Sequence, residues 1–358
     1  MIEAHFGETG PFSVGVEEEL MVLDAESLLL APKAAELFAA SKEAGLPGTL
    51  KSELFASALE LNTGICKSPE QAGETLAGLR LSAAELAKER DLRLAASGSH
   101  PISRPDEQEI ADEPRYAEFV EYAGISARRQ GVNGLHVHIG MESGDACFHA
   151  LEGVLPWLPV VLALSVNSPY IAGEETGLMS NRAEVLAQLP RSGAPPAFRS
   201  YREWEEFVER FIGLGLADEY TRFWWDIRPH PSFGTLEIRM PDQPTAPERT
   251  TGFVALLRGL CEAVLEEPPR EYDPAARGLY DQNRWAASRF GLAGELVHPD
   301  GSRTARASEL ADELFELVGE AGLLDTSRTE ADRQLEVGRS EGLEAVCADL
   351  CERTLTSP

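Results

Sequence analysis

Three consecutive glutamates inside an apolar segment constrain this chain most strongly. Residues 12–24 read FSVGVEEELMVLD, so Glu17, Glu18 and Glu19 interrupt a stretch that otherwise has the composition of a buried strand. Adjacent carboxylates repel one another and cost free energy when they leave water. A chain that places them in a strand must therefore either expose that strand or offset their charge with cations.

Alternation along this segment separates its side chains onto two faces, because residues two apart share a face of a strand. Glu18 is the exception, since it falls on the apolar side near the edge of that face. One face carries Val14, Val16, Leu20 and Val22, and the other carries Ser13, Gly15, Glu17, Glu19 and Met21.

Four other predicted strands repeat the design: SALELNT (57–63), GLHVHIG (134–140), WWDIRPH (224–230) and GTLEIRMPD (234–242). Each has one apolar face, which we expect to pack under helices. A solvated sheet face normally carries a loose mixture of Thr, Lys, Ser and Gln, and Lys is absent from these segments. The pattern predicts a polar concave face with a cationic partner. Its charged groups are Glu60, His136 and His138, Asp226 and Arg228, and Glu237 and Arg239.

A divalent cation is the natural partner for such a face. Glu17, Glu19, Glu60 and Glu237 cannot all stay ionised side by side without one, and oxygen ligands favour Mg²⁺ or Mn²⁺. Because Mg²⁺ usually takes only one or two carboxylates, this number indicates more than one ion. The arginines on the same face predict that the site also binds a carboxylate or phosphate group, because the planar guanidinium group binds either one in bidentate fashion.

Each motif alone also has a structural explanation. GVEEEL fits an exposed edge strand, HVH fits two ordinary sheet histidines or a zinc pair, and Glu237 with Arg239 fits a cross-strand salt bridge. Asn181 and Arg182 alone fit a helix surface. No HExxH motif or cysteine ligand supports zinc. Neither GxxxxGK[ST] nor a strand-linked GxGxxG is present, so a nucleotide would bind on another scaffold.

Composition excludes other classes of function. The 358 residues carry a formal charge of -28, from 32 basic and 60 acidic residues, which argues against nucleic-acid and membrane partners. The N-terminus, MIEAHFGETG, lacks the basic and apolar regions of a secretory signal. The apolar run from Val154 contains two prolines, is too short for a membrane span, and predicts a core helix that begins after Pro159. Five cysteines without a CxxC pair fit reduced thiols in a cytoplasmic protein.

Helical periodicity predicts six helices in addition to that core helix. The clearest start is at SPEQ, where Ser68 is the predicted N-cap and Pro69 the first helical residue. Length alone suggests about two domains. The predicted helices span about residues 69–90, 115–130, 201–218, 247–265, 305–322 and 328–353.

Six segments between residue 12 and about residue 292 together resemble the glutamate–cysteine ligase type 2 family, and within it the YbdK-like carboxylate–amine ligases. The resemblance implies one α+β catalytic domain over residues 1–358, with a C-terminal helical part from about residue 300. It also implies an antiparallel sheet curved into a funnel with helices outside, as in glutamine synthetase and guanidino kinases. The segments are FSVGVEEELMVLD, SELFASALELNTGIC, GVNGLHVHIG, SNRAEVLAQLPRSGAPPAF, WWDIRPHPSFGTLEIRMPDQPT and NRWAASRFGL.

The resemblance implies an ATP-dependent ligase that uses Mg²⁺, with Mn²⁺ as the alternative ion. In that reaction the glutamate γ-carboxylate attacks the ATP γ-phosphate, which gives an acyl phosphate and ADP. The amine of a second substrate, cysteine in the family's named reaction, then displaces phosphate to form an amide. The partners are thus small molecules, and a homodimer is left open.

Matching the family's motifs position by position implies a role for each candidate. Arg239 matches the arginine that contacts the transferred phosphoryl group, and His136 lies with it among the catalytic positions. Arg182 matches a reader of a substrate carboxylate, and Arg228 lies in the DIRP stretch of the ligand-binding set. Contact of His138 with substrate is left open. The metal positions are Glu17, Glu19, Glu53, Glu60 and Glu237.

Two other functions fit the same residues. One is a magnesium-dependent kinase of a small carboxylate or guanidino substrate, which would stop at a stable phosphorylated product. The other is a non-catalytic protein that binds divalent ions and uses its arginines only to balance charge. Formation of an amide separates the ligase from the kinase, and binding of ATP separates both from the ion-binding protein.

Overall fold

A seven-stranded antiparallel sheet carries all of the predicted polar faces. The computed structural model describes residues 2–319 and 324–355. The strand order is β2-β3-β1-β5-β9-β8, with β4 also paired to β1. This confirms the predicted α+β fold with an antiparallel sheet. The strands are β1 (Val14–Asp24), β2 (Thr49–Ser52), β3 (Ala58–Asn62), β4 (Leu92–Ala95), β5 (Leu135–Gly140), β8 (Ile227–His230) and β9 (Thr235–Ile238).

Strand β1 lies inside the sheet, so the explanation of GVEEEL as an exposed edge strand is wrong. It pairs with β3 on one side, where Glu19 lies opposite Glu60, and with β5 on the other, where Glu17 lies opposite His136. The apolar face of the strand is closed, as the complete burial of Leu20 shows. The glutamates therefore sit at the centre of the sheet rather than at its rim.

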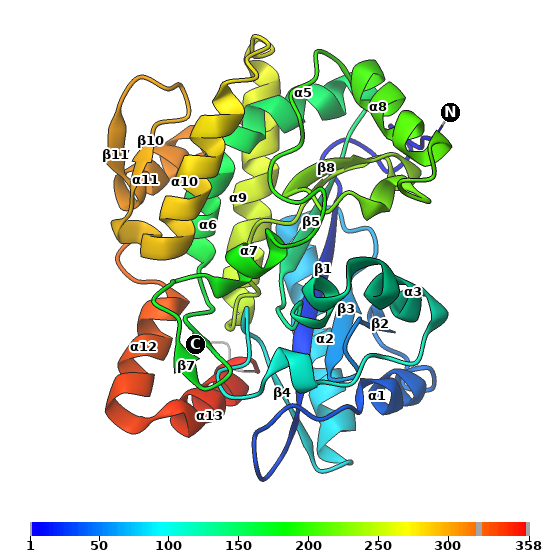
Figure 1. The fold of residues 1–358 in the computed structure, drawn as a ribbon, viewed down its shortest axis with the longest axis vertical. Helices are drawn as coiled ribbons and strands as arrows, with labels where there is room; N and C mark the ends of the chain where they lie inside the picture. The colour runs from blue at the N-terminus through cyan, green and yellow to red at the C-terminus, as the bar shows by residue number, and fades with distance from the viewer. Residues whose placement is uncertain (1, 320–323, 356–358) are drawn as a thin grey trace.

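Helices cover the apolar face and leave part of the polar face to loops and α3 (Figure 1). The helices α2 (Pro69–Lys88) and α9 (Pro247–Glu266) pack against β1, and α5 (Gly144–Val154) packs against β8 and β9. The side chain of Ser68 caps α2 and Pro69 is its first residue, as predicted. The remaining α-helices are α1 (Ala34–Ser41), α3 (Pro114–Ala123), α4 (Ile125–Arg128), α6 (Leu158–Ser165), α7 (Asn181–Leu186), α8 (Tyr201–Gly213), α10 (Ala276–Phe290), α11 (Ala307–Val318), α12 (Glu330–Glu341) and α13 (Leu343–Arg353).

Short elements complete the chain. Two small hairpins lie outside the main sheet, and single turns of 3-10 helix join larger elements. The hairpins are β6 (Tyr170–Ile171) with β7 (Glu174–Glu175) and β10 (Glu295–Val297) with β11 (Thr304–Arg306). The 3-10 turns are η1 (Pro105–Glu107), η2 (Leu155–Trp157), η3 (Tyr220–Arg222), η4 (Pro231–Phe233) and η5 (Gly291–Ala293).

Two predicted helices are wrong because each is broken by a glycine. The helix predicted over 115–130 divides into α3 and α4 at Gly124, and the one over 328–353 divides into α12 and α13 at Gly342. Both glycines have positive φ, 58° and 94°, a conformation that other residues adopt at a cost. Hydrophobic periodicity continues across both breaks and so hides them. The predicted helix over 305–322 is α11, and its residues 320–322 lie outside the described residues.

The apolar segment Gly144–Ser165 is long and apolar enough for a membrane span by length and composition alone. However, 78% of its most apolar window is buried inside the protein, which identifies it as a core helix. The predicted start after Pro159 was slightly wrong. Helix α6 begins at Leu158 and holds Pro159 in its first turn, where a missing N–H breaks no helical hydrogen bond.

Glu18, the residue that broke the alternation, is paired inside the core. It is fully buried, and Arg80 of α2 grips both of its oxygens, at 2.6 and 2.7 Å. Arg80 also donates to the carbonyls of Thr245 and Thr354, at 2.5 and 3.0 Å. A charged residue on the apolar face is thus tolerated because a helix supplies the cation and the remaining donors are satisfied.

We expect Arg80→Met to lower the free energy of unfolding by about 3–5 kcal/mol, because it leaves the Glu18 carboxylate buried without its cation. Chemical denaturation of the purified variant measures this. Arg202→Met is the matched control, because Arg202 pairs with Glu206 at the exposed surface, where the loss of an ion pair has little effect on stability. Equal small losses for both variants would contradict a supporting role of the buried pair.

Candidate active site

The register of the sheet gathers the predicted site residues on one face. Glu60 stands between Glu19 on β1 and Lys51 on β2. Glu237 stands between His138 on β5 and Arg228 on β8. Strands from distant parts of the sequence therefore deliver carboxylates, imidazoles and cations to a common surface, as the alternation predicted.

Glu17 and the two histidines of HVH form the centre of this surface. The Nδ1 atom of His136 lies 3.3 Å from Glu17, and the Nε2 atom of His138 lies 4.0 Å from it. Burial alone would raise the pKa of the Glu17 carboxyl, but the hydrogen bond with His136 and the charges of His138 and His136 outweigh burial and lower that pKa to about 2. Glu17 is consequently an ionised acceptor at neutral pH.

Glu237 is held between two arginines. Arg228 grips its two oxygens at 2.5 and 3.1 Å, and Arg239 donates to it at 2.6 Å. Burial would raise the pKa of the Glu237 carboxyl, but the charges of Arg228 and Arg239 hold it well below its usual range. Arg228 also donates hydrogen bonds to the carbonyls of Thr221 and Phe223. Among residues 2–319 and 324–355, the guanidinium group of Arg239 hydrogen-bonds Glu237 alone, so its other N–H groups stay available to a ligand.

The opposite end of the surface has too few cations. Burial, followed by the charges of Glu60 and Glu19, raises the pKa of the Glu53 carboxyl well above its usual value. Lys51 lies 3.2 Å from Glu60, but its side chain is 50% exposed. This lysine corrects the expectation that Lys is absent from the polar face. The carboxylates at this end would be stabilised by an added cation.

Two cavities open onto these residues. The smaller, about 210 Å³, is lined by Glu53, Glu60, Glu237 and Arg239, among others. The larger, about 520 Å³, reaches the apolar side chains of Ile65 and Phe233 and falls in the size range of small-molecule pockets. They adjoin, since both are lined by Glu17, Lys51, His138 and Phe233.

The donor chemistry of this surface fits a hard divalent cation. Within the described part of the chain, no three His, Cys, Asp or Glu side chains already form a group able to hold a metal ion. However, Glu60 and Glu19 lie close enough to Glu53 for their charges to raise its pKa. A set of carboxylates such as these three selects Mg²⁺ or Mn²⁺.

Arg182 lies beneath this surface and lines neither cavity. It is 2% exposed, so the alternative of a helix-surface residue is wrong. Its guanidinium group donates to the carbonyls of Arg239 and Met240, at 3.0 and 3.1 Å. It also occupies the space beside Gly134, where an added Cβ would meet it at 2.0 Å. In this conformation Arg182 supports the backbone next to Arg239.

Sequence reasoning missed three ionisable residues that line the smaller cavity: Lys51, Arg115 and His230. His230 stacks on Phe233 at 4.1 Å, and burial lowers its pKa to about 4. Its position two residues after Arg228 on the same strand face was a usable signal. Arg115 comes from α3, and nothing in its local sequence connects it to the sheet.

Comparison with known proteins decides the family. The sequence model of glutamate-cysteine ligase family 2 (GCS2) matches residues 13–341. The chain belongs to this family. The predicted family and the predicted class of enzyme, a ligase of glutamate–cysteine ligase type, are thereby confirmed.

Relatives match over nearly the whole chain. A Rubrobacter xylanophilus protein named "Putative glutamate--cysteine ligase 2-3" is 40% identical over 99% of this chain and 100% of its own length. A Sorangium cellulosum protein named "Putative glutamate--cysteine ligase 2" is 33% identical over 96% of both chains.

Two solved structures share the fold at 15% identity. The first is the glutamate–cysteine ligase of Francisella tularensis in complex with AMP, with a TM-score of 0.74 over 96% of this chain and 88% of that one. The second is a bifunctional glutathione synthetase from Pasteurella multocida, with a TM-score of 0.71 over 96% of this chain and 52% of that one. At this identity they show that the fold is that of these enzymes.

The raised pKa of Glu53 gives a direct test for the cation. Below the raised pKa of Glu53, binding of Mg²⁺ should release a proton from its carboxyl group, because the ion favours the ionised carboxylate. The release should decline as the pH rises, since Glu53 is then already ionised. Calorimetry in buffers with different ionisation enthalpies measures the proton count.

Glu53→Gln should abolish this release, while Glu262→Gln, which removes an exposed carboxylate paired with Arg258, should leave it unchanged. Tight binding of Mg²⁺ to the unmodified protein without any proton exchange would rule out the carboxyl cluster as its site.

Proposed function

We propose that this chain is an ATP-dependent carboxylate–amine ligase of the glutamate–cysteine ligase type. It phosphorylates the γ-carboxylate of glutamate and joins the product to an amine. One observation carries the proposal: a carboxylate cluster short of cations faces Arg239 across a cavity that opens into a larger one. Such a site holds phosphates and metal ions together, which phosphoryl transfer between two anions requires.

Glu17, Glu19, Glu53, Glu60 and Glu237 are the proposed metal ligands, for Mg²⁺ or for Mn²⁺. When bound, the ions neutralise charge on the ATP phosphates and on the carboxylate substrate. The protein's own contribution is to keep these glutamates ionised and in place. Arg228 does so for Glu237, through its two-point contact, and His136 does so for Glu17. We assign His136 to the catalytic set on this basis.

Arg239 is the proposed contact to the transferred phosphoryl group. It lies at the end of the carboxylate row and keeps N–H donors for charge that develops on the phosphoryl oxygens. Arg182 acts through Arg239, because the hydrogen bond that it donates to the Arg239 carbonyl fixes the backbone of that residue. We propose this positioning role for Arg182 in place of direct contact with a substrate carboxylate, since its guanidinium group is already bonded to carbonyls.

The two cavities suggest how the substrates divide the site. The larger is the proposed nucleotide site, because apolar Ile65 and Phe233 can contact a base while Lys51 and Glu17 connect it to the phosphates. The smaller receives the glutamate γ-carboxylate and the amine, for which cysteine is the first candidate. The two chemical steps balance. The γ-carboxylate oxygen bonds to phosphorus as ADP leaves, and the amine nitrogen then bonds to the acyl carbon as phosphate leaves.

We place the enzyme in the cytoplasm and treat residues 1–358 as a single catalytic domain. The five cysteines are all buried and unpaired, as expected of a reducing compartment. The helices after about residue 300 belong to that domain because Thr354 and Glu330 bond to segments that adjoin the site. A homodimer stays a prediction from the resemblance.

An isotope-exchange experiment tests the ligase. With ATP, Mg²⁺ and glutamate but no amine, label placed in the ATP β,γ-bridge oxygen should scramble into non-bridge β positions. This follows because the acyl phosphate forms reversibly and the ADP β-phosphate rotates before reversal. Addition of cysteine or another accepted amine should then give an amide and one phosphate per ADP. Arg239→Met should abolish scrambling, while the exposed control Arg202→Met should not.

Other outcomes would select the alternative functions. A stable phosphorylated product without an amide, whatever amine is supplied, would identify a kinase. The absence of both scrambling and ADP release with every carboxylate and amine tested would leave only the ion-binding protein.

A further inference from the structure

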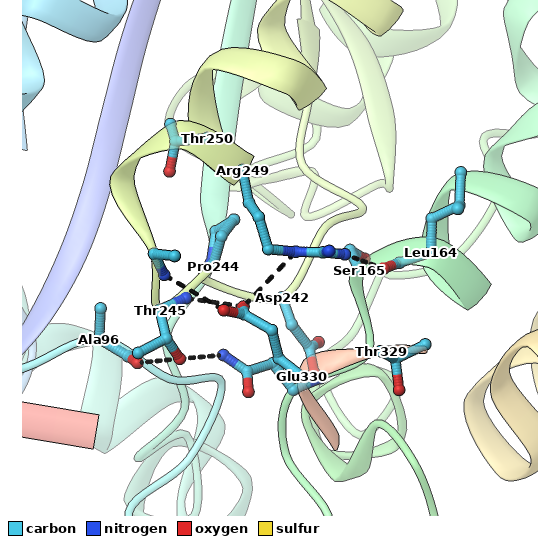
Figure 2. Close-up of polar contacts among 12 residues, drawn as sticks. Ala96, Leu164, Ser165, Asp242, Pro244, Thr245, Arg249, Thr250, Thr329 and Glu330 are labelled. Atoms are coloured by element: carbon cyan, nitrogen blue, oxygen red, sulfur yellow. Dashed lines mark hydrogen bonds and ion pairs between the residues drawn. The ribbon is translucent and has the colours of Figure 1, made fainter. Parts of the chain in front are cut away.

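The end of the chain, where the sequence shows no recognisable motif, reaches the loop that follows β9. Glu330, the first residue of α12, is 5% exposed and accepts hydrogen bonds from the backbone N–H groups of Thr245 and Ala246, at 2.7 and 3.2 Å. Figure 2 shows its carboxylate directed at this loop. Helix α9 begins at the next residue, Pro247, and Ala246 has no side chain to cap it. A carboxylate 85 residues away therefore supplies the N-terminal cap of α9.

Further contacts hold this cap in place. Arg353 of α13 donates to Glu330 at 3.2 Å. The Nε atom of Arg249 lies 4.0 Å from the Glu330 carboxylate, as Figure 2 shows. Thr245 donates through its hydroxyl to the carbonyl of Ala96 at 2.8 Å. The two C-terminal helices thus fix the conformation of residues 242–246, which follow the strand that carries Glu237 and Arg239.

Gln243 extends from this fixed loop to the triple glutamate. Its Nε2 donates to Glu18 at 3.0 Å, and its Oε1 accepts the backbone N–H of Glu19 at 3.0 Å. The direction of the amide is determined, because the ionised Glu18 gripped by Arg80 can only accept hydrogen bonds. The Gln243 oxygen must then face Glu19. Gln243 is fully buried, so this arrangement has no solvent alternative.

The bond to Glu19 replaces a missing strand partner. Strand β5 pairs with β1 only from Val14 to Glu18, so at Glu19 the ladder on that side has ended. Gln243 accepts the N–H of Glu19 there, while the Glu19 carboxylate accepts the N–H of Gly134 at 2.5 Å. The backbone of Gln243 is itself bonded to the carbonyl of Asn133 at 3.2 Å. The backbone position of Glu19 on this side of β1 therefore depends on Gln243.

We propose that Gln243 is a positioning residue for the metal ligand Glu19, and that α12 contributes to the metal site through Glu330, which holds the loop that carries Gln243. The inference rests on the proposed function in one respect, the assignment of Glu19 as a ligand. Gln243 itself touches neither metal nor substrate. It acts by fixing the backbone from which the Glu19 carboxylate extends.

The test compares two buried amides. Gln243→Met keeps the length of the side chain and removes its bonds to Glu18 and Glu19. We expect the affinity for Mn²⁺ to fall about 10-fold. The affinity is measured from the decrease of the free-ion signal in electron paramagnetic resonance. Turnover of ATP should require correspondingly more Mg²⁺, with the KM for the amine unchanged.

Asn283→Leu is the matched control. The Asn283 amide also makes one donated and one accepted bond to the backbone, both with Val297 at the edge of the β10–β11 hairpin. Its loss should lower thermal stability without changing Mn²⁺ affinity. Gln243→Asn, which keeps the amide but shortens it, provides a second variant should Gln243→Met fold poorly. Glu330→Ala should weaken Mn²⁺ binding in the same direction as Gln243→Met and by less.

The readout separates this inference from the proposed function, because Mn²⁺ binding requires no ligase activity. Unchanged Mn²⁺ affinity in a folded Gln243→Met or Gln243→Asn variant would overturn the positioning role. Weakened affinity in these variants, with the control unchanged, would support it even if no amine were ever joined to glutamate. Absence of Mn²⁺ binding by the unmodified protein would overturn the inference at its premise.

Discussion

The buried ion pair between Glu18 and Arg80 fixes the register on which the whole site depends. A slip of one residue along β1 would turn every side chain of the strand to the other face. With three glutamates in a row, hydrophobic alternation alone specifies the register weakly at this point. Because Arg80 pairs with the middle carboxylate on the apolar side, Glu17 and Glu19 are left on the polar face of the sheet, where Glu17 lines both cavities. Glu18, the residue that breaks the alternation, therefore specifies the register of β1.

The charge of the site is balanced unevenly, and the imbalance has a function. At one end Arg228 and Arg239 keep Glu237 ionised without help. At the other end burial and neighbouring carboxylates raise the pKa of Glu53 well above its usual value, which disfavours its ionised form in the absence of a cation. A ligand that brings both phosphates and divalent cations satisfies the two ends together: the arginines meet the phosphates, and the glutamates meet the ions. This combination explains a cation-dependent site for anions within a chain of net charge -28.

The sequence predicts what local periodicity encodes and misses what distant contacts decide. Alternation identified the strands and placed Glu17, Glu60, His136 and Glu237 on one face. It missed β2, whose sequence TLKS offers Leu50 as its single apolar side chain, and with it Lys51. Glycine breaks in α3–α4 and α12–α13 interrupt patterns that otherwise continue. Arg80 lies 62 residues from its partner Glu18, and Glu330 lies 84–85 residues from the N–H groups that it accepts before α9, so no local signal marks either contact.

Anomalous diffraction from crystals grown with Mn²⁺ and a non-hydrolysable ATP analogue would test the central claim most directly. The account predicts manganese peaks on the polar face of the sheet, within coordination distance of carboxylates from the set Glu17, Glu19, Glu53, Glu60 and Glu237, with the γ-phosphate beside Arg239. Manganese and nucleotide bound together at another surface, with these five carboxylates free of metal, would contradict it.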